Sequence, residues 1–353
     1  MKKIDLTALA KKSVRTLQAY QAKEIPCAVK LDANESPYSL GAFENLLVKN
    51  ALKQLNRYPD PEARALREAI ANAYGVTPEN ILLGNGSDEI IYYLIITFGG
   101  PVIYPVPTFS MYGIISQALG EKHSGIPLDP RFDIDLAAMD GVVKKLSPKL
   151  LFLSSPNNPT GNCYSTDRIR ALIKSSPGIV VVDEAYQPFS EEGTFLGSHR
   201  KCRNLVVLRT FSKIGFASLR VGFMVADAAL VQEVNKVRLP YNLNALSQAI
   251  ALQAMKSRGA VEKAIGAVVS ERKRLMEELG SLEGVTPCRS DANFILFRVA
   301  RATDVYEGLL QRGVLVRNMD GVVRGALRVT VGTPRENSLF LRALRGVLRK
   351  VRR

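Results

Sequence analysis

The sequence predicts an α/β protein: a mostly parallel sheet flanked by helices in a large domain, followed by a smaller α+β domain. Short runs that are apolar throughout alternate with helical stretches between residues 81 and 225. Such runs are typical of strands covered on both faces, and these usually belong to parallel sheets. Beyond residue 290 the short strands alternate in polarity, which indicates one covered face. The length of 353 residues fits about two domains.

The predicted strands of the large sheet are 81–83, 102–104, 150–153, 179–182, 205–208 and 223–225. A helix is predicted before the first strand, at 62–74, and further helices between the strands, for example at 89–98. We expect residues 1–37 to form an N-terminal arm, 38–240 the large domain and 241–353 the small domain, against which the arm packs. In sheets of this kind ligands bind beyond the carboxyl ends of the strands, so we expect the functional residues at those ends.

Composition narrows the classes of function. The net charge of +15 is compatible with nucleic acid, an anionic membrane or an acidic small substrate. The basic residues are spread along the chain without interleaved aromatics, and the arm is too short for a DNA-reading module, so no nucleic-acid partner is expected. Residues 90–120 carry no charge, but glycines and prolines divide them into pieces too short for a membrane span.

The cysteines and histidines do not predict a metal site. Cys27, Cys163, Cys202 and Cys288 lie far apart, and the chain has only two histidines. This usage favours a reduced, cytoplasmic setting. No secretory signal is visible in residues 1–14.

Lys213 is the candidate nucleophile. It follows the buried strand 205–208 and is flanked by Phe211, Ile214 and Phe216, so poor solvation should lower the pKa of its amine. Hydroxyl and guanidinium donors nearby suit a phosphate; they are Thr210, Ser212 and Arg220. A phosphate-bearing aldehyde would fit these groups, and pyridoxal phosphate is the commonest. An isolated Ser-Lys pair is, however, far more often a surface turn.

Other strand ends supply the remaining parts of such a site. Gly84 to Asp88 opens a helix, where free N–H groups bind anions, although Ser87 could be a simple cap. Phe109 could stack on a flat ring or belong to the core, and Asn157 could donate to a ring oxygen or merely form a turn. Asp183 ends a buried strand and needs a cation unless it caps a helix. Each signal is weak alone, but their coincidence on one edge of the sheet predicts a cofactor site.

The motifs Ser155-Pro156-Asn157-Asn158-Pro159-Thr160-Gly161, Asp183-x-x-Tyr186 and Ser212-Lys213 occur together in this order. With them, nearly the whole chain resembles the fold-type I pyridoxal-phosphate aminotransferases. The stretches 56–59 and 238–242 resemble the histidinol-phosphate branch. The resemblance implies conversion of L-histidinol phosphate and 2-oxoglutarate to imidazole-acetol phosphate and L-glutamate, in histidine biosynthesis. A threonine-phosphate decarboxylase, an aromatic or broad-specificity aminotransferase, and a nucleic-acid-binding regulator are the alternatives.

The resemblance also implies roles for residues. Lys213, Asp183 and Tyr186 would be catalytic. The cofactor would be held by Ser87, Asp88, Phe109, Asn157, Asp183, Tyr186, Thr210, Ser212, Lys213 and Arg220. Tyr58 would reach the cofactor phosphate from a neighbouring subunit, which implies a homodimer with shared active sites. The substrate would meet Tyr20, Asn34, Arg317 and Arg328, although arginines on short strands can also be simple surface residues. Arg220 follows Lys213 by seven residues where relatives usually have eight.

Overall fold

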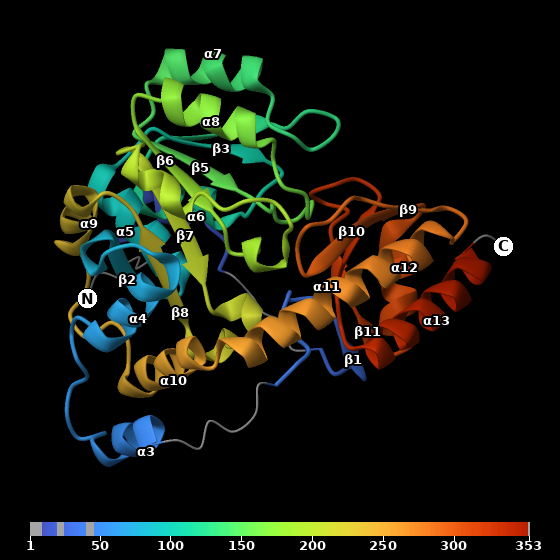
Figure 1. Ribbon diagram of the computed structural model, residues 1–353. Coiled ribbons are helices and arrows are strands. Elements are labelled where there is room, and N and C mark those ends of the chain that lie inside the picture. Colours follow the sequence, from blue (N-terminus) through green and yellow to red (C-terminus); the bar gives the residue numbers. More distant parts are fainter. Residues whose placement is uncertain (1–8, 20–24, 40–45, 352–353) are drawn as a thin grey trace, which may run out of the picture.

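The computed structural model describes residues 9–19, 25–39 and 46–351, and it has two lobes (Figure 1). The larger lobe is built on a seven-stranded sheet in the order β2-β8-β7-β6-β5-β3-β4. Its strands are β2 (Ile81–Asn85), β3 (Val102–Val106), β4 (His123–Pro127), β5 (Leu150–Ser154), β6 (Ile179–Asp183), β7 (Leu205–Thr210) and β8 (Val221–Val225). Only β8 runs antiparallel to its neighbours within this sheet. The predicted mostly parallel sheet is confirmed.

Sequence analysis missed β4. This strand lies at the edge of the sheet and is largely exposed, so it lacks the apolar run that identifies a buried strand.

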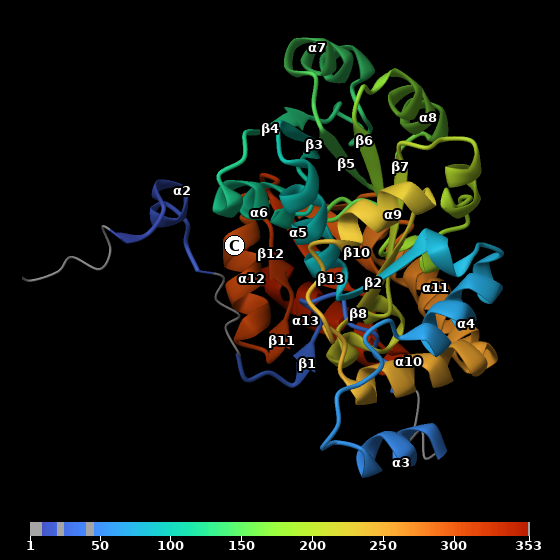
Figure 2. The same cartoon turned by 90° about the vertical axis from the view of Figure 1, so that its left-hand side faces the viewer.

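Helices cover both faces of the large sheet (Figures 1 and 2). Alternate residues of each strand point to opposite faces, so the apolar strands feed two separate cores. One core includes α4 (Arg64–Tyr74), α7 (Leu136–Leu146) and α8 (Thr166–Ser175). The other includes α5 (Ser87–Phe98), α6 (Met111–Leu119) and α9 (Ala228–Asn235). Of the residues that the structure describes, none belongs to a helix long and apolar enough to cross a bilayer.

The smaller lobe is α+β. Its antiparallel sheet has the order β12-β13-β10-β9, formed by β9 (Val285–Pro287), β10 (Phe294–Val299), β12 (Arg317–Asn318) and β13 (Ala326–Thr330). Helices α12 (Ala302–Leu310) and α13 (Pro334–Val351) pack with it in one core. From the N-terminal arm, β1 (Val29–Lys30) pairs in parallel with β11 (Val314–Leu315), so this part of the arm lies against the small lobe.

Helix α11 (Arg258–Gly280) joins the lobes, because its Val261 belongs to the large core and its Leu275 to the small one. Helix α10 (Ala245–Lys256) packs on α4 and on α3 (Leu46–Lys53), and its Ala251 is part of the large core. The large core therefore extends about twenty residues past the boundary that we predicted at residue 240, because the apolar faces of α10 and early α11 pack on that lobe.

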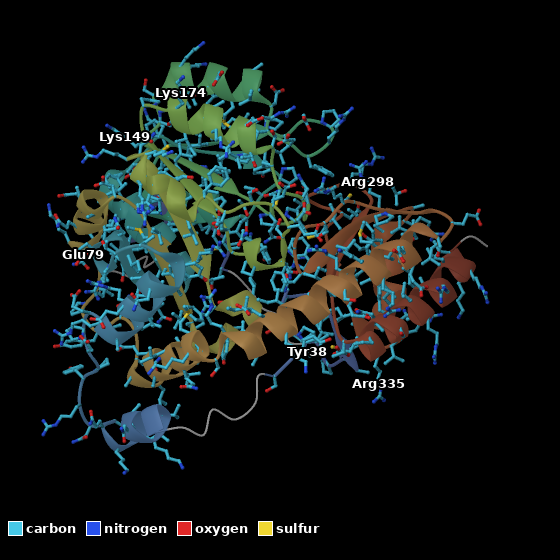
Figure 3. The ribbon with its side chains drawn as sticks, in the orientation of Figure 1. Tyr38, Glu79, Lys149, Lys174, Arg298 and Arg335 are labelled. Atoms are coloured by element: carbon cyan, nitrogen blue, oxygen red, sulfur yellow. The ribbon has the colours of Figure 1, made fainter. Side chains whose placement is uncertain are left out.

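Basic side chains are dispersed over both lobes. Lys149, Lys174, Arg298 and Arg335 are all exposed and project from different elements (Figure 3). Helix α2 (Lys12–Arg15) adds two more basic residues beside α6. The positive charge of the described chain is thus distributed and is not confined to one face.

Candidate active site

A cavity of about 90 Å³ lies where the strands of the large sheet end. Register aligns the strand ends at this edge: Ser154 of β5 pairs with Asp183 of β6, which pairs with Leu208 of β7. The cavity is lined by Ser87, Asp88, Phe109, Ser154, Asn158, Asp183, Ala185, Tyr186, Thr210, Ser212, Lys213 and Arg220. The structure therefore brings together nearly all of the residues predicted to hold the cofactor from four separate stretches of the chain.

Lys213 enters the cavity from η4 (Ser212–Ile214), directly after β7. Buried Phe211 and Phe216 flank the segment, and the lysine itself is half-buried. Its Nζ lies 5.5 Å from the centre of the Tyr186 ring, close enough for a cation–π contact. The amine is thus held among aromatic groups and faces Asp183 and Tyr186 across the same small space.

Asp183 is buried, with 4% of its surface exposed. Tyr112 Oη donates to its Oδ2 at 2.8 Å and the Ala185 amide donates to its Oδ1 at 3.0 Å. Burial raises the pKa of this carboxyl to about 6, although both hydrogen bonds act in the opposite direction. A buried carboxyl of this kind gains most from a cation placed in the cavity.

Tyr112 was missed by sequence analysis. It is completely buried, stacks on Phe152 at 4.8 Å, and burial raises its pKa well above the usual value, so its hydroxyl remains a donor. Tyr112 is the second residue of α6, and its only sequence signal is an aromatic residue in an apolar stretch.

The opposite end of the cavity suits an anion. The α5 N-terminus presents Ser87, and Thr210 Oγ1 donates to Ser212 Oγ at 2.9 Å. Two glycines let these groups approach: a Cβ on Gly222 would lie 2.5 Å from the Ser87 amide nitrogen, and one on Gly86 would lie 2.5 Å from Arg220 Nη2. Backbone N–H groups at a helix start, hydroxyls and a guanidinium form a typical phosphate-binding set.

Arg220 reaches this end despite its short spacing from Lys213. Its backbone is left-handed, with φ of 53°, at the end of η5 (Ala217–Leu219). The side chain pairs with Asp88 Oδ2 at 3.1 Å and lies 3.5 Å from Ser212 Oγ. A spacing of seven residues is therefore sufficient for the side chains of Lys213 and Arg220 to line the same cavity.

In the turn after β5, the sequence prediction is off by one residue. Asn157 is completely buried and turned into its own turn: Nδ2 donates to Pro107 O and Thr160 Oγ1, and Oδ1 accepts from Thr108. The neighbouring Asn158 lines the cavity instead. The prediction that Asn157 faces the cofactor ring is therefore wrong in this structure, because its amide already satisfies the turn.

The arm and the small lobe complete the site. Asn34, buried and left-handed with φ of 56°, donates from Nδ2 to Tyr186 Oη at 3.0 Å. Arg328 donates from Nη1 to Asn158 Oδ1 at 2.5 Å and from Nη2 to Asp32 O at 2.8 Å. Arg317 is exposed and stands directly opposite Arg328 in the β12–β13 pairing, so the two arginines do lie on adjacent strands.

One further predicted residue lies away from the cavity. Tyr58 is 81% exposed and stacks on Tyr241, with ring centres 4.5 Å apart. Its predicted role in a neighbouring subunit's site stays a prediction. Tyr20 lies outside the described residues.

A lysine, a buried carboxyl and an anion-binding end beyond parallel strands define an enzyme that works on amines with a phosphate-bearing cofactor. The family model for aminotransferase class I and II matches residues 26–344, and the chain belongs to this family. The predicted aminotransferase activity and pyridoxal phosphate as its cofactor are thereby confirmed.

Individual relatives agree with the family. The chain is 44% identical over 344 residues to the histidinol-phosphate aminotransferase of Aquifex aeolicus, covering 94% of this chain and 96% of that protein. It is 41% identical over 350 residues to that of a Thermoanaerobacter species, covering 96% and 99%. Among solved structures, the histidinol-phosphate aminotransferase of Sinorhizobium meliloti, in complex with pyridoxal-5'-phosphate, matches with a TM-score of 0.88 at 22% identity over 98% of both chains. At that identity the likeness concerns the fold.

Proposed function

We propose that this aminotransferase moves an amino group between L-histidinol phosphate and 2-oxoglutarate, giving imidazole-acetol phosphate and L-glutamate, as a step of histidine biosynthesis. The observation that carries the proposal is the single cavity in which Lys213, Asp183 and Arg220 meet. The substrate is inferred from relatives at 44% and 41% identity that carry this name.

The residues present fit pyridoxal phosphate. The buried carboxylate of Asp183 requires a cationic partner, which a protonated ring nitrogen provides. The end of the cavity lined by Ser87, Thr210, Ser212 and Arg220 suits the cofactor phosphate. The residues that would hold it are Ser87, Asp88, Phe109, Asn158, Asp183, Tyr186, Thr210, Ser212, Lys213 and Arg220. When bound, the cofactor supplies a carbonyl that condenses with amines and a ring that accepts the electrons left on the substrate α-carbon.

The side chains divide the work around that ring. Asp183 would keep the ring nitrogen protonated, and Tyr112 would hold the carboxylate in place through its hydrogen bond of 2.8 Å. Tyr186, itself held by Asn34, would donate to the ring hydroxyl. Lys213 Nζ would remove the proton from the substrate α-carbon and deliver it to the cofactor carbon, as a general base and then a general acid.

The substrate end would recognise anions. Histidinol phosphate carries a phosphate and no carboxylate, whereas glutamate carries two carboxylates. Guanidinium groups accept either anion through paired N–H donors. Arg328, held by Asn158 and Asp32 at the cavity, and Arg317 on the adjacent strand would serve both substrates in turn.

The assembly and setting belong to the same proposal. A homodimer would place Tyr58 at the partner's cofactor phosphate, and its exposure in a single chain leaves it available for that contact. The protein would work in the cytoplasm on small molecules, without nucleic-acid or membrane partners.

The test follows the bound cofactor by its visible spectrum. Purified protein loaded with pyridoxal phosphate should lose the visible absorbance of the amine-accepting, aldehyde form of the cofactor when histidinol phosphate is added, and 2-oxoglutarate should restore it. Lys213→Ala is the matched control and should show neither change.

Carbon dioxide released from threonine phosphate without a 2-oxo acid would favour the decarboxylase. A faster response to an aromatic amino acid than to histidinol phosphate would favour a broad-specificity aminotransferase.

A further inference from the structure

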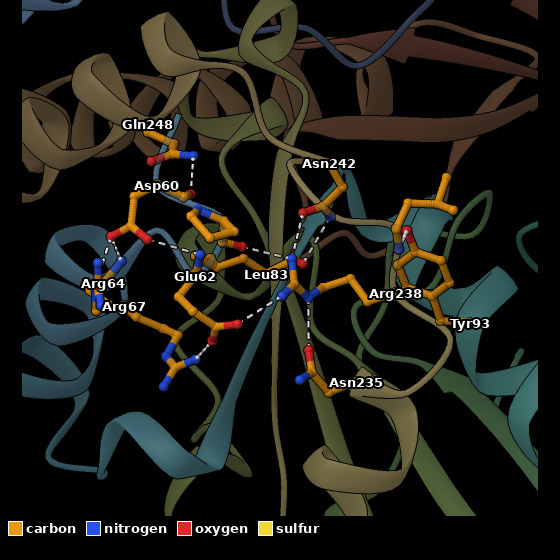
Figure 4. Close-up of polar contacts among 12 residues, drawn as sticks. Asp60, Glu62, Arg64, Arg67, Leu83, Tyr93, Asn235, Arg238, Asn242 and Gln248 are labelled. Carbon is orange, nitrogen blue, oxygen red and sulfur yellow. Dashed lines mark hydrogen bonds and ion pairs between the residues drawn. The ribbon is translucent and has the colours of Figure 1, made fainter. Parts of the chain in front are cut away.

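The Arg238 guanidinium of the stretch 238–242 binds residues 61 and 62, which lie just after the stretch 56–59 (Figure 4). Both stretches resemble the histidinol-phosphate branch. The Arg238 side chain is 11% exposed. It donates from Nε to Asn235 Oδ1 at 2.7 Å and from Nη1 to Pro61 O at 2.9 Å. It also reaches Asn242 Oδ1 at 3.2 Å and Glu62 Oε1 at 3.1 Å. Arg238 is therefore fixed by acceptors from separate segments.

One branch of this network leads to the loop that carries Tyr58. Pro61 O and Glu62 lie at the end of that loop, and Arg67 Nη1 binds Glu62 Oε2 at 2.7 Å from the first turn of α4. Tyr58 in turn stacks on Tyr241, one residue before Asn242. The loop is thus held to the 238–242 segment at both the guanidinium and the paired rings.

The other branch leads to the anion-binding end of the active site. Asn242 Nδ2 donates to Leu83 O at 3.2 Å and to Glu89 Oε2 at 2.7 Å. The same Glu89 oxygen accepts from the Asn85 amide at 2.6 Å. Asn85 ends β2 and immediately precedes Gly86 and Ser87, so this chain of contacts sets where the loop enters α5.

We propose that Arg238 is a positioning residue for the anion-binding loop 85–88, acting through Asn242 and Glu89. This inference rests on the proposed function, because it assigns the loop to the cofactor phosphate. The N–H groups at the start of a helix bind an anion only when they point at the same place. The planar guanidinium of Arg238, bound by several fixed acceptors, holds Asn242 in place and thereby the loop that carries these N–H groups. A hollow of about 220 Å³ borders Arg238, Glu62 and Asn242. Truncating the guanidinium would leave room for these partners to shift.

The expected effect is specific to the phosphate. Arg238→Gln should weaken binding of pyridoxal phosphate by about 10- to 100-fold, the range that follows from losing a charge-assisted hydrogen bond. Binding of pyridoxal, which lacks the phosphate, should change less than about twofold, because Lys213, Asp183 and Tyr186 do not touch the network. A general loosening of the fold would weaken both ligands alike.

The experiment titrates the apoprotein with pyridoxal phosphate and, separately, with pyridoxal, and compares the ratio of the two dissociation constants between variants. Arg64→Gln is the matched control: its ion pair with Asp60 is nearby but its side chain is 71% exposed. Arg238→Lys keeps the charge without the fork and should give an intermediate ratio. If Arg238→Gln does not fold, Asn242→Asp answers the same question, because it repels Glu89 while leaving the Glu62 branch in place.

A fall in the ratio of the pyridoxal dissociation constant to the pyridoxal phosphate dissociation constant in Arg238→Gln or Asn242→Asp, but not in Arg64→Gln, supports the inference. An unchanged ratio, or equal weakening of both ligands, overturns it. A wild-type protein that does not prefer pyridoxal phosphate over pyridoxal would instead contradict the proposed function, so the two failures are distinguishable.

Discussion

Asp183 is a residue whose proposed function lowers the stability of the protein without its cofactor. Its carboxyl is buried beside a cavity, and its pKa of about 6 lies above the ordinary value of 3.8. In the absence of a cationic ligand, the folded protein therefore binds this proton more tightly than the unfolded chain does. The stability that this proton gives is complete below about pH 4 and is lost as the pH rises through 6.

Asp183→Asn should for that reason stabilise the apoprotein while abolishing activity. Asparagine is isosteric and can accept from Ala185 and donate to Tyr112, so it avoids the cost of a buried charge. We expect a gain of about 3 kcal/mol in the free energy of unfolding at pH 8, which shrinks towards pH 4. Urea denaturation of both apoproteins at several pH values measures it. A gain of equal size at pH 4 and pH 8 would contradict the role given to the charge.

At the scale of elements, the sequence predicted which strands approach the site and less well which side chain of a turn faces it. A run of buried residues fixes a strand and its end, so Asp183 and Lys213 could be placed at the sheet edge. In the turn after β5, the choice between Asn157 and Asn158 depends on contacts with Thr108 and Arg328. These partners are distant in sequence, and a one-residue change in turn geometry exchanges the two roles.

Alanine at the two asparagines should separate folding from function. Asn157→Ala removes three hydrogen bonds from a buried turn and should lower the free energy of unfolding by about 3 kcal/mol. Asn158→Ala should cost less than about 1 kcal/mol of stability but lower kcat/KM by about 10- to 100-fold. Urea unfolding and steady-state kinetics on both variants test this. Loss of kcat/KM in a fully folded Asn157→Ala, with Asn158→Ala active, would restore the original assignment.

At the scale of the whole molecule, the site lies where the two lobes and the arm meet. Arg272 of α11 is buried and donates to Phe189 O of the large lobe and to Ala292 O of the small lobe. Across the cavity, Arg328 of the small lobe binds Asn158 of the large one. These contacts join the two lobes through residues that are far apart in the sequence, so a sequence pattern, which identifies one element at a time, does not predict them.

The exposed Tyr58 gives the proposed dimer a test that does not depend on measuring its size. If Tyr58 acts in the partner's site, a chain with Lys213→Ala and a chain with Tyr58→Ala carry complementary defects. In a C2 dimer that contains one of each, one of the two sites combines an intact Lys213 with an intact Tyr58 from the other chain.

Refolding an equal mixture of the two inactive variants should therefore recover about a quarter of the wild-type activity per site, because half of the dimers are mixed and each has one complete site. Each variant refolded alone is the control, and size-exclusion chromatography of the mixture checks that dimers form. If Tyr58 instead acts within its own chain, each site of a mixed dimer carries one of the two defects and none is complete. The activity would then remain at the level of the separate variants. A recovered activity that rises with protein concentration before reaching its plateau would further tie the complete site to association of two chains.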